Sequence, residues 1–267
     1  MDKHAVIPQI KLYLFDMDGT LYLGDQLYPF TCELLQTIRR TGGRYLFMTN
    51  NSSKSVSAYI EKLAKLGIPA VYEDFITSSQ ATAYYLKKHH PGKRLYVCGT
   101  QSLKDELAGQ GFEITEDIDA TQCIVMGFDT ELTFQKLLDV SKMLCTRDLP
   151  YIATNPDYVC PTEFGSVPDC GSVCDMIFNA TGKRPTVIGK PQALMPQLAM
   201  EMTGCTPENT AVVGDRIYTD IKSGLNAGTV TILVMSGETT YEILESSPDK
   251  PHFVMESAAE ILEILKS

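Results

Sequence analysis

Short apolar runs alternate along this chain with longer segments whose apolar residues recur at helical spacing. The runs indicate strands because they are brief, rich in β-branched and aromatic residues, and bounded by small or polar residues. Strands are expected at residues 12–15, 44–48, 95–98, 123–127, 150–154, 185–189, 211–214 and 230–235. The alternation predicts an α/β fold with a mainly parallel sheet and helices on its faces.

The segments between the strands have the apolar spacing of amphipathic helices, and several close on glycine, which best tolerates a left-handed helix C-cap. Helices are expected within residues 29–43, 55–67, 79–90, 132–144, 192–204 and 221–228. Hydrophobic residues make up 44% and charged residues 21%, which is typical of globular proteins. No apolar run reaches the roughly 20 residues that cross a bilayer, so we expect a soluble protein.

The net charge and the cysteines indicate which partners and which cellular compartment to expect. A net charge of −10 disfavours nucleic acid or an anionic membrane as partner, because both require a basic face. The first residues lack a secretory pattern and the eight cysteines are scattered, so we expect reduced thiols in the cytoplasm. Cys160, Cys170 and Cys174 lie near one another in sequence, but no CxxC pair exists, which disfavours a zinc site.

Polar residues follow several of the expected strands. In open α/β sheets, ligands bind beyond the carboxyl ends of the strands, where the strand order reverses. The polar residues at these ends are Asp16, Asp18, Thr49, Lys190 and Asp215. We expect them to converge on one edge of the sheet. No glycine-rich phosphate loop follows any strand, so neither a nucleotide-cradling loop nor a Rossmann-type oxidoreductase is supported.

The acidic residues predict a metal site. Asp16 and Asp18 are two residues apart, and extended backbone sends such residues to the same side. Two close carboxylates repel each other unless a cation lies beside them, and Mg²⁺ suits oxygen ligands of this kind. Asp215 supplies a further carboxylate. Asp220 either caps a helix or contributes to the metal site.

The distance between Thr49 and Lys190 predicts an insertion. About 140 residues separate them, whereas one strand–helix–strand crossover takes roughly 30 or somewhat more. The extra residues carry their own alternation of strands and helices. We therefore expect an inserted α/β domain at residues 79–183, with residues 1–78 and 184–267 forming the other domain.

Four motifs, "DMDGT", "MTNN", "GKP" and "GDRIYTD", occur in this order and resemble those of the haloacid dehalogenase (HAD) superfamily of aspartate-nucleophile phosphohydrolases. The resemblance spans nearly the whole chain. The insertion, with "TNPDYVCPTEFGSVPDCGS" inside it, resembles the NagD-like and nitrophenylphosphatase-like branch. It implies a Rossmann-like, HAD-like core with a large inserted α/β cap domain, and a short hairpin flap at "GTLYLGD".

The resemblance also implies residue roles. Asp16 would be the nucleophile that forms an aspartyl-phosphate, and Asp18 the general acid and then the general base. Mg²⁺ would be held by Asp16, by the backbone carbonyl of Asp18 and by Asp215, with Asp220 at the same site.

The phosphoryl group would be held by Thr49, the backbone of Asn50, Asn51 and Lys190. For Arg216, phosphate binding and a surface ion pair both stay open.

The cap carries the candidates for contacts with the leaving group. They are Asn155, Asp157, Glu163 and the loop at residues 168–172. Turn-forming residues dominate this stretch, so a purely structural loop is the alternative for each of them.

These observations favour a Mg²⁺-dependent phosphatase whose partner is a small phosphorylated metabolite. Phosphotransfer to an acceptor other than water stays open, because its first half-reaction is identical. A non-catalytic regulatory protein that keeps the fold is a further alternative, although none of the four motifs is lost. Dehalogenase activity is disfavoured because it needs neither Asp18 nor Asp215. Capped relatives are often dimers, so a homodimer also stays open.

Overall fold

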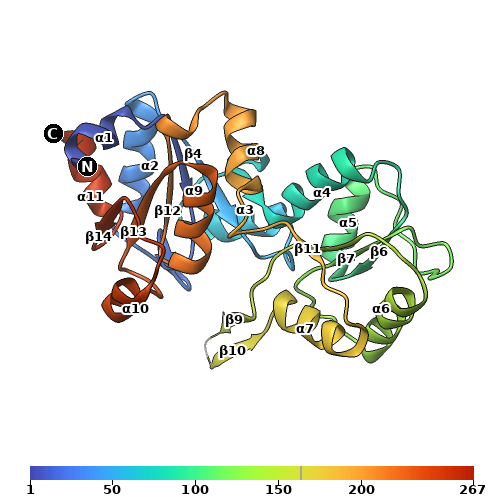
Figure 1. Ribbon diagram of the computed structural model, residues 1–267. Helices are drawn as coiled ribbons and strands as arrows, with labels where there is room; N and C mark the ends of the chain where they lie inside the picture. Colours follow the sequence, from blue (N-terminus) through green and yellow to red (C-terminus); the bar gives the residue numbers. More distant parts are fainter. Residues whose placement is uncertain (163) are drawn as a thin grey trace. The chain divides into compact units, whose positions relative to one another are not determined.

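The computed structural model describes residues 1–162 and 164–267, which form two compact units (Figure 1). The first unit comprises Met1–Thr49, Val56–Ile76 and Lys190–Ser267, and the second comprises Asn50–Ser55 and Thr77–Gly189. The chain therefore passes between the units four times. No helix among the described residues has the length and apolar character that a membrane span requires.

The first unit is built on a six-stranded sheet with the order β14-β13-β12-β1-β4-β5. The strands are β1 (Leu12–Phe15), β4 (Arg44–Thr49), β5 (Phe75–Thr77), β12 (Thr210–Gly214), β13 (Val230–Val234) and β14 (Phe253–Met255). β1 pairs in parallel with both β12 and β4, so that Phe15 lies opposite Val213 on one side and Phe47 on the other. The strand order reverses around β1, which places a ligand-binding edge at its carboxyl end.

Helices cover both faces of this sheet. They are α2 (Thr31–Arg40), α3 (Val56–Lys65), α8 (Leu194–Thr203), α9 (Lys222–Ala227), α10 (Tyr241–Ser246) and α11 (Ala259–Lys266). Short turns are α1 (Lys3–Val6), η1 (Ile7–Gln9), η2 (Tyr72–Asp74), η3 (Pro207–Asn209) and η4 (Ile217–Ile221). α2 contacts α11 and β4, whereas α8 contacts β1 and α9 contacts β12 and β13. The result is a sheet between two helical layers.

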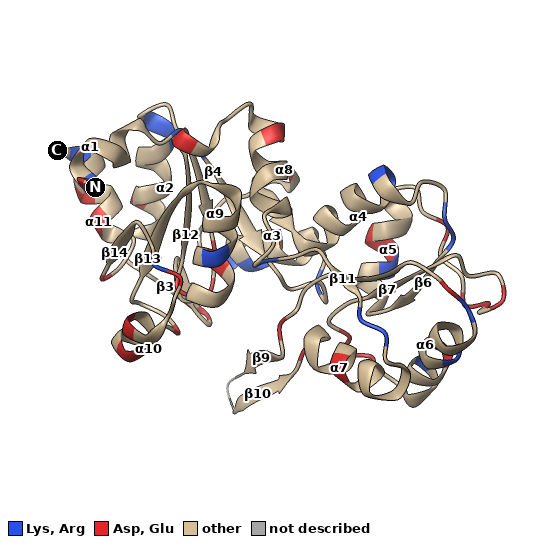
Figure 2. Ribbon diagram, viewed as in Figure 1, with Lys and Arg blue, Asp and Glu red and all other residues tan. Residues whose placement is uncertain are grey.

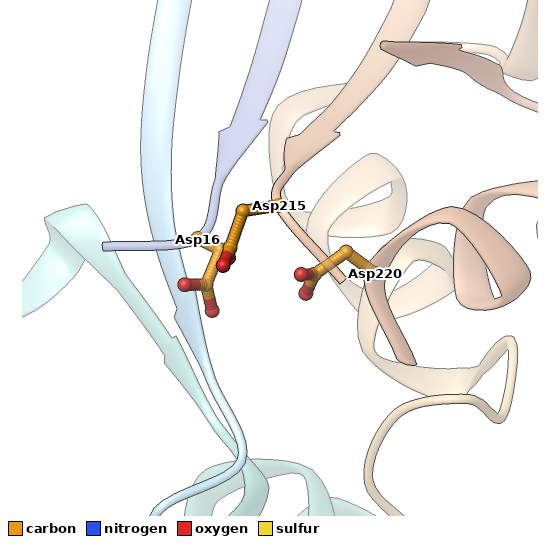
Figure 3. Close-up of side chains that lie close together, drawn as sticks. All are labelled: Asp16, Asp215 and Asp220. Atoms are coloured by element: carbon orange, nitrogen blue, oxygen red, sulfur yellow. The ribbon is translucent and has the colours of Figure 1, made fainter. Parts of the chain in front are cut away.

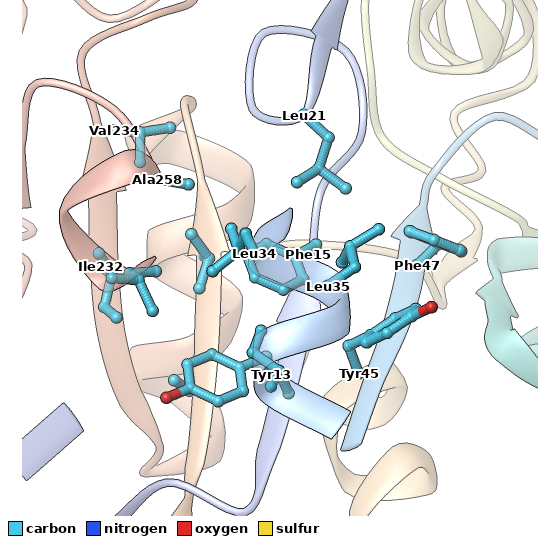
Figure 4. Packing of buried hydrophobic residues seen from close by; sticks show 14 of the residues in the cluster. Tyr13, Phe15, Leu21, Leu34, Leu35, Tyr45, Phe47, Ile232, Val234 and Ala258 are labelled. Carbon is cyan, nitrogen blue, oxygen red and sulfur yellow. The ribbon is translucent and has the colours of Figure 1, made fainter. Parts of the chain in front are cut away.

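Alternate residues of β1 anchor the larger core. Tyr13 and Phe15 point to one face, because successive strand residues point to opposite faces. There they belong to one buried cluster with Phe47 of β4 and with Leu34 and Leu35 of α2 (Figure 4). Each such side chain contributes about 1.5–3 kcal/mol through burial. β1 is therefore held firmly, and with it the residues that follow its carboxyl end.

A short antiparallel hairpin follows β1, formed by β2 (Tyr22–Leu23) and β3 (Gln26–Leu27). It lies in the segment where the sequence predicts a hairpin flap. Gly19 begins the turn into it with φ 81°, a left-handed conformation that favours glycine.

The second unit contains a four-stranded parallel sheet with the order β11-β8-β7-β6. Its strands are β6 (Leu95–Cys98), β7 (Cys123–Met126), β8 (Tyr151–Ala153) and β11 (Thr186–Val187), and its helices are α4 (Ser78–His89), α5 (Gln101–Gly109), α6 (Phe134–Thr146) and α7 (Cys170–Thr181). Buried residues of α6 and α7 form one cluster with β6, β7 and β8. Cys170 and Cys174 are part of this cluster.

The α/β class with parallel sheets is confirmed, and the strands and helices that the sequence predicts are present. The structure adds the edge strands β5 and β14 and the helices α5, α7, α10 and α11, together with an antiparallel hairpin of β9 (Val159–Thr162) and β10 (Gly165–Pro168). The sequence pattern indicates only a turn-rich loop at this hairpin, because proline and glycine interrupt the strand signal. The assignment of residues 79–183 to a cap domain stays a prediction.

Acidic and basic residues are interspersed over the helices and loops of each unit (Figure 2). Asp and Glu number 33, against 23 Lys and Arg. Positive charge for an anionic substrate therefore has to come from particular side chains rather than from a basic face.

Glu106 of α5 makes the folding stability dependent on pH. Its Oε1 atom is buried without a hydrogen-bond partner in the described part of the chain, and burial raises the pKa of the carboxyl from 4.5 to about 7. The folded state thus binds the proton more tightly than the unfolded chain, so this carboxyl lowers stability as the pH rises from about 4.5 to about 7.

We expect Glu106→Gln to be more stable than the wild type at pH 8, by up to about 3 kcal/mol. The difference should shrink towards zero at pH 4.5. Urea unfolding at several pH values measures it, with Asp105→Asn on the exposed side of the same helix as the control. A difference that does not change with pH would contradict this origin.

Candidate active site

Three carboxylates converge at the carboxyl end of the first sheet (Figure 3). Asp16 directly follows β1, Asp215 directly follows β12, and Asp220 belongs to η4. One oxygen from each lies within 4.8 Å of the others. β1 and β12 are neighbours in parallel, and the Asp16 N–H continues their ladder by donating to Val213 O at 2.9 Å. The sheet itself thus brings Asp16 and Asp215 together.

Lys190 is the cation of the group. Its Nζ atom lies 2.7 Å from Asp16 Oδ1 and 2.5 Å from Asp220 Oδ1, and it also donates to Met48 O at 3.3 Å. The lysine is 3% exposed and Asp220 is fully buried. Burial lowers the pKa of the amine, but the two carboxylates outweigh it and raise the pKa above its ordinary value. Lys190 is therefore charged and holds two of the three acids.

The surroundings of the Asp215 carboxylate show whether a metal ion fits this site. Its Oδ2 accepts a hydrogen bond from the Glu238 N–H at 2.7 Å, whereas its buried Oδ1 has no hydrogen-bond partner among the residues that the structure describes. Burial, and then the charges of Asp16 and Asp220, raise the pKa of Asp215 to about 8. A buried carboxylate oxygen beside two further acids is costly unless a cation compensates it. The oxygen donors fit a divalent metal ion.

Two glycines make room for Asp215. A Cβ atom on Gly19 would lie 2.6 Å from Asp215 Oδ2, and one on Gly237 would lie 2.0 Å from it. Neither distance is tolerated by a real side chain. Glycine is therefore required at both positions to leave space for this carboxylate. Gly237 and Glu238 lie outside the four sequence motifs, so the motifs did not predict their contacts with Asp215.

Asp220 does not cap the following helix. α9 begins at Lys222 without a side-chain cap, and Asp220 lies one element earlier, in η4. Its Oδ2 accepts from the backbone N–H of Arg216 at 3.1 Å while Oδ1 binds Lys190. Burial raises the pKa of Asp220 to about 6, although Lys190 opposes the rise. Asp220 therefore does not cap α9, but it binds the backbone N–H at the start of η4 and also belongs to the carboxylate group.

Asp18 lies outside the group of three carboxylates. It is exposed, and its Oδ1 accepts a hydrogen bond from the Gly24 N–H of the flap hairpin at 3.3 Å. β1 ends at Phe15 and the backbone then turns, as the hydrogen bond from Leu21 N to Met17 O shows. The two-residue alternation of a strand does not continue to Asp18, so this carboxyl is separated from the buried acids and open to solvent.

Arg216 forms an ion pair with Glu238, and the negative charge of Asp16 also acts on it. Its Nε atom is 2.8 Å from Glu238 Oε2. Burial lowers the pKa of the guanidinium, but Asp16 and then Glu238 raise it above its ordinary value. The ion pair that the sequence left open is present, and it does not exclude a phosphate contact.

The remaining candidates lie at the chain crossings and in the second unit. Thr49 ends β4 and is 8% exposed. Asn155 and Asp157 both contact Asn50. The Asn155 side-chain amide donates to the Asn50 backbone oxygen at 2.7 Å, and the Asn50 side-chain amide donates to Asp157 Oδ2 at 3.0 Å. Asn51 accepts from the Ser53 N–H at 2.9 Å, which stabilises a turn.

In the loop Pro168–Ser172, Asp169 caps α7 and Ser172 donates to Tyr158 O. Glu163 lies outside the described residues.

Family models match most of the first unit and part of the second. Residues 13–113 match a model described as haloacid dehalogenase-like hydrolase, and residues 187–261 match one described as HAD-hydrolase-like. The chain is 34% identical over 250 residues to the 5'-nucleotidase YutF of Bacillus subtilis, which covers 94% of this chain and 96% of that protein.

Two solved structures agree with this match. The 4-nitrophenylphosphatase of Thermotoga maritima superposes with a TM-score of 0.91 at 39% identity and covers 98% of both chains. NagD of Escherichia coli K-12 superposes with a TM-score of 0.86 at 31% identity and covers 94% of this chain and 98% of that one.

The fold and the site define a hydrolase with a mainly parallel, Rossmann-like sheet and a carboxylate-rich edge. The chain belongs to the haloacid dehalogenase-like hydrolases, in the branch of the NagD and nitrophenylphosphatase proteins. It is an enzyme of the phosphatase type.

We expect Lys190→Met to destabilise the fold strongly in the presence of EDTA. The substitution leaves Asp220 buried without its cation, and breaking a buried ion pair from one side costs about 3–5 kcal/mol. Urea unfolding measures the loss. The double variant Lys190→Met/Asp220→Asn is the matched control and should recover part of it, because no buried charge remains at position 220. A single variant as stable as the wild type would contradict the role of this pair.

Proposed function

We propose that this enzyme is a Mg²⁺-dependent phosphatase that hydrolyses small phosphate monoesters through an aspartyl-phosphate on Asp16. The observation that carries the proposal is the Asp16 carboxylate at the end of the central strand, 2.7 Å from Lys190 Nζ and grouped with Asp215 and Asp220. Relatives named as 5'-nucleotidase and 4-nitrophenylphosphatase support a phosphate ester as substrate.

The metal would be held by Asp16 and Asp215, with the backbone carbonyl of Asp18 and the carboxylate of Asp220 at the same site. Oxygen ligands and a phosphate substrate suit Mg²⁺, which binds through few carboxylates and keeps several waters. When bound, the ion would offset negative charge on the transferring phosphoryl group.

The first step transfers the phosphoryl group to the enzyme. An oxygen of Asp16 attacks phosphorus, and the bond between phosphorus and the leaving oxygen breaks. Asp18 gives its proton to that oxygen, which departs as an alcohol. The exposed position of Asp18 on the flap side supports this role, because the leaving group has to depart towards solvent.

The second step regenerates the enzyme. Asp18, now ionised, accepts a proton from water as the water oxygen attacks phosphorus. The bond between phosphorus and Asp16 breaks, and inorganic phosphate leaves. The separation of Asp18 from the buried acids supports this role, since it can change its charge without disturbing the Lys190 ion pairs.

The phosphoryl oxygens would be bound by the Thr49 hydroxyl, the backbone N–H of Asn50 and the Lys190 amine, with Asn51 and Arg216 as further candidates. The residues 79–183 would form the cap that selects the substrate. We place this enzyme in the cytoplasm, where small phosphorylated metabolites are its partners.

Asp16→Asn should reduce hydrolysis of 4-nitrophenyl phosphate to below about one-thousandth of the wild-type rate, because the nucleophile is lost. EDTA should abolish wild-type turnover, and added Mg²⁺ should restore it. Release of 4-nitrophenol by the purified protein is the measurement, with unfolding curves as the control for folding. Full activity of Asp16→Asn would refute the assignment of the nucleophile.

Asp18→Asn should lower turnover by about 10²–10⁴-fold and should accumulate phosphorylated enzyme with an aryl phosphate. An aryl leaving group needs little protonation, so the first step survives, whereas the second step lacks its base. Intact-protein mass spectrometry after rapid acid quench detects the added phosphoryl group. An absence of this species, together with equal losses on aryl and alkyl phosphates, would argue against the proposed role of Asp18.

A further inference from the structure

The segment Asn50–Ser55 follows Thr49 directly but belongs to the second unit. Ser52 Oγ lies 2.9 Å from Thr154 Oγ1 and accepts from the Phe128 N–H at 2.9 Å. The carbonyl of Ser53 accepts from Thr100 Oγ1 at 3.1 Å. The segment is thus hydrogen-bonded to residues that follow β6, β7 and β8, at the carboxyl edge of the second sheet.

Asn50 is held most completely. Its carbonyl oxygen accepts from Ser78 Oγ at 2.6 Å and from Asn155 Nδ2 at 2.7 Å. Its side-chain amide donates to the Asp157 carboxylate at 3.0 and 3.3 Å. Ser78 and Asn155 are fully buried and Asn50 is 7% exposed, so the two bonds to the Asn50 carbonyl are shielded from water.

Two more chain crossings meet at Asn50. Ser78 is the second residue of the second unit after the crossing at Ile76. Gly189 directly precedes Lys190, its N–H donates to Thr154 O at 2.8 Å, and a Cβ on it would lie 2.6 Å from Asn50 Oδ1. We call Asn50, Ser78, Asn155, Asp157 and Gly189 the crossing cluster. Three of the four crossings pass through it.

Two of these crossings carry residues of the phosphate site. Thr49 is joined to Asn50, and Lys190 is joined to Gly189, by single peptide bonds. The position of a residue is tightly limited by that of its neighbour, because consecutive Cα atoms are fixed at about 3.8 Å. A displacement of about 1 Å at a reacting site can cost about 10²-fold in rate.

We infer that Asn155 and Asp157 are positioning residues: they act through Asn50 on the phosphate-binding segment at Thr49–Asn50 and do not contact the leaving group. The inference rests on the proposed function, which it deepens. Asn155 is fully buried and its amide is engaged with a backbone carbonyl, and both carboxylate oxygens of Asp157 receive the Asn50 amide. These bonds direct both side chains towards Asn50.

Asp157→Ala tests the inference with three esters that share the phosphoryl group but differ in leaving group: an aryl phosphate, a hexose phosphate and a nucleoside monophosphate. We expect kcat/KM to fall about tenfold to hundredfold by the same factor on all three. The affinity for inorganic phosphate, which has no leaving group, should fall as well. Asp157→Asn should restore most of both, because its amide oxygen can still accept the bond from Asn50.

Losses that differ among the three esters, with unchanged binding of inorganic phosphate, would overturn the inference and assign Asp157 to the leaving group. Asp139→Ala is the matched control. It removes a carboxylate that accepts a hydrogen bond from Tyr96 at 2.9 Å in the same unit, away from the crossing cluster. It should leave kcat/KM and phosphate affinity unchanged.

A double-mutant cycle tests whether Asp157 acts through Asn50. Asn50→Ala removes the amide that donates to Asp157, so the double variant should be no worse than either single variant. Additive losses would show independent actions and overturn the inference. If Asp157→Ala does not fold, Asp157→Ser serves in its place, because it also lacks the carboxylate that accepts from the Asn50 amide.

Calorimetric titration with inorganic phosphate and Mg²⁺ separates this inference from the proposed function. A wild type that binds phosphate but hydrolyses no ester would refute the function, while the variants would still decide the role of Asp157. A wild type that neither binds nor hydrolyses would overturn both.

Discussion

The site depends on one buried ammonium group between two carboxylates. Lys190 Nζ lies 2.7 Å from Asp16 and 2.5 Å from Asp220, and the lysine is almost completely buried. Each acid alone would pay a desolvation cost of several kcal/mol in this position. The shared cation offsets the charges of Asp16 and Asp220, whereas Oδ1 of Asp215 is buried without a hydrogen-bond partner among the described residues. The site thus combines three acids with one lysine, and this arrangement of oxygen ligands fits a divalent metal ion.

The order of the strands assembles this charge pattern from distant parts of the chain. β1 lies between β12 and β4, so the ends of three adjacent parallel strands deliver Asp16, Asp215 and Thr49 to one edge. Lys190 then arrives where the chain re-enters the first unit after Gly189. Backbone ladders fix the three strand ends, whereas Lys190 follows β11 by three residues and Asp220 lies in η4. The ion pair between these two side chains fixes them relative to each other.

Much of the site could be predicted from the sequence, because polar residues directly after apolar runs mark the carboxyl edge of a parallel sheet. Asp16, Asp215 and Lys190 follow this rule, and the structure brings them together with Asp220. Asp18 departs from it, since strand geometry ends at Phe15. The contacts of Asn50 with Asn155 and Asp157 join residues 105 and 107 positions apart. No local pattern encodes such pairs, as they depend on the register of a second sheet.

The second sheet also has a carboxyl edge, the place where α/β folds usually bind ligands. Here the segment Asn50–Ser55 is hydrogen-bonded to the residues that follow β6, β7 and β8. That edge thus binds the enzyme's own chain, next to Thr49, whose hydroxyl we propose as a phosphate ligand. Glycine at position 189 is required by the same arrangement, because a Cβ there would collide with Asn50 and with the Thr154 carbonyl. Substitutions in the second unit can therefore change phosphate affinity without touching the substrate, whereas substrate selection has to use residues outside the crossing cluster.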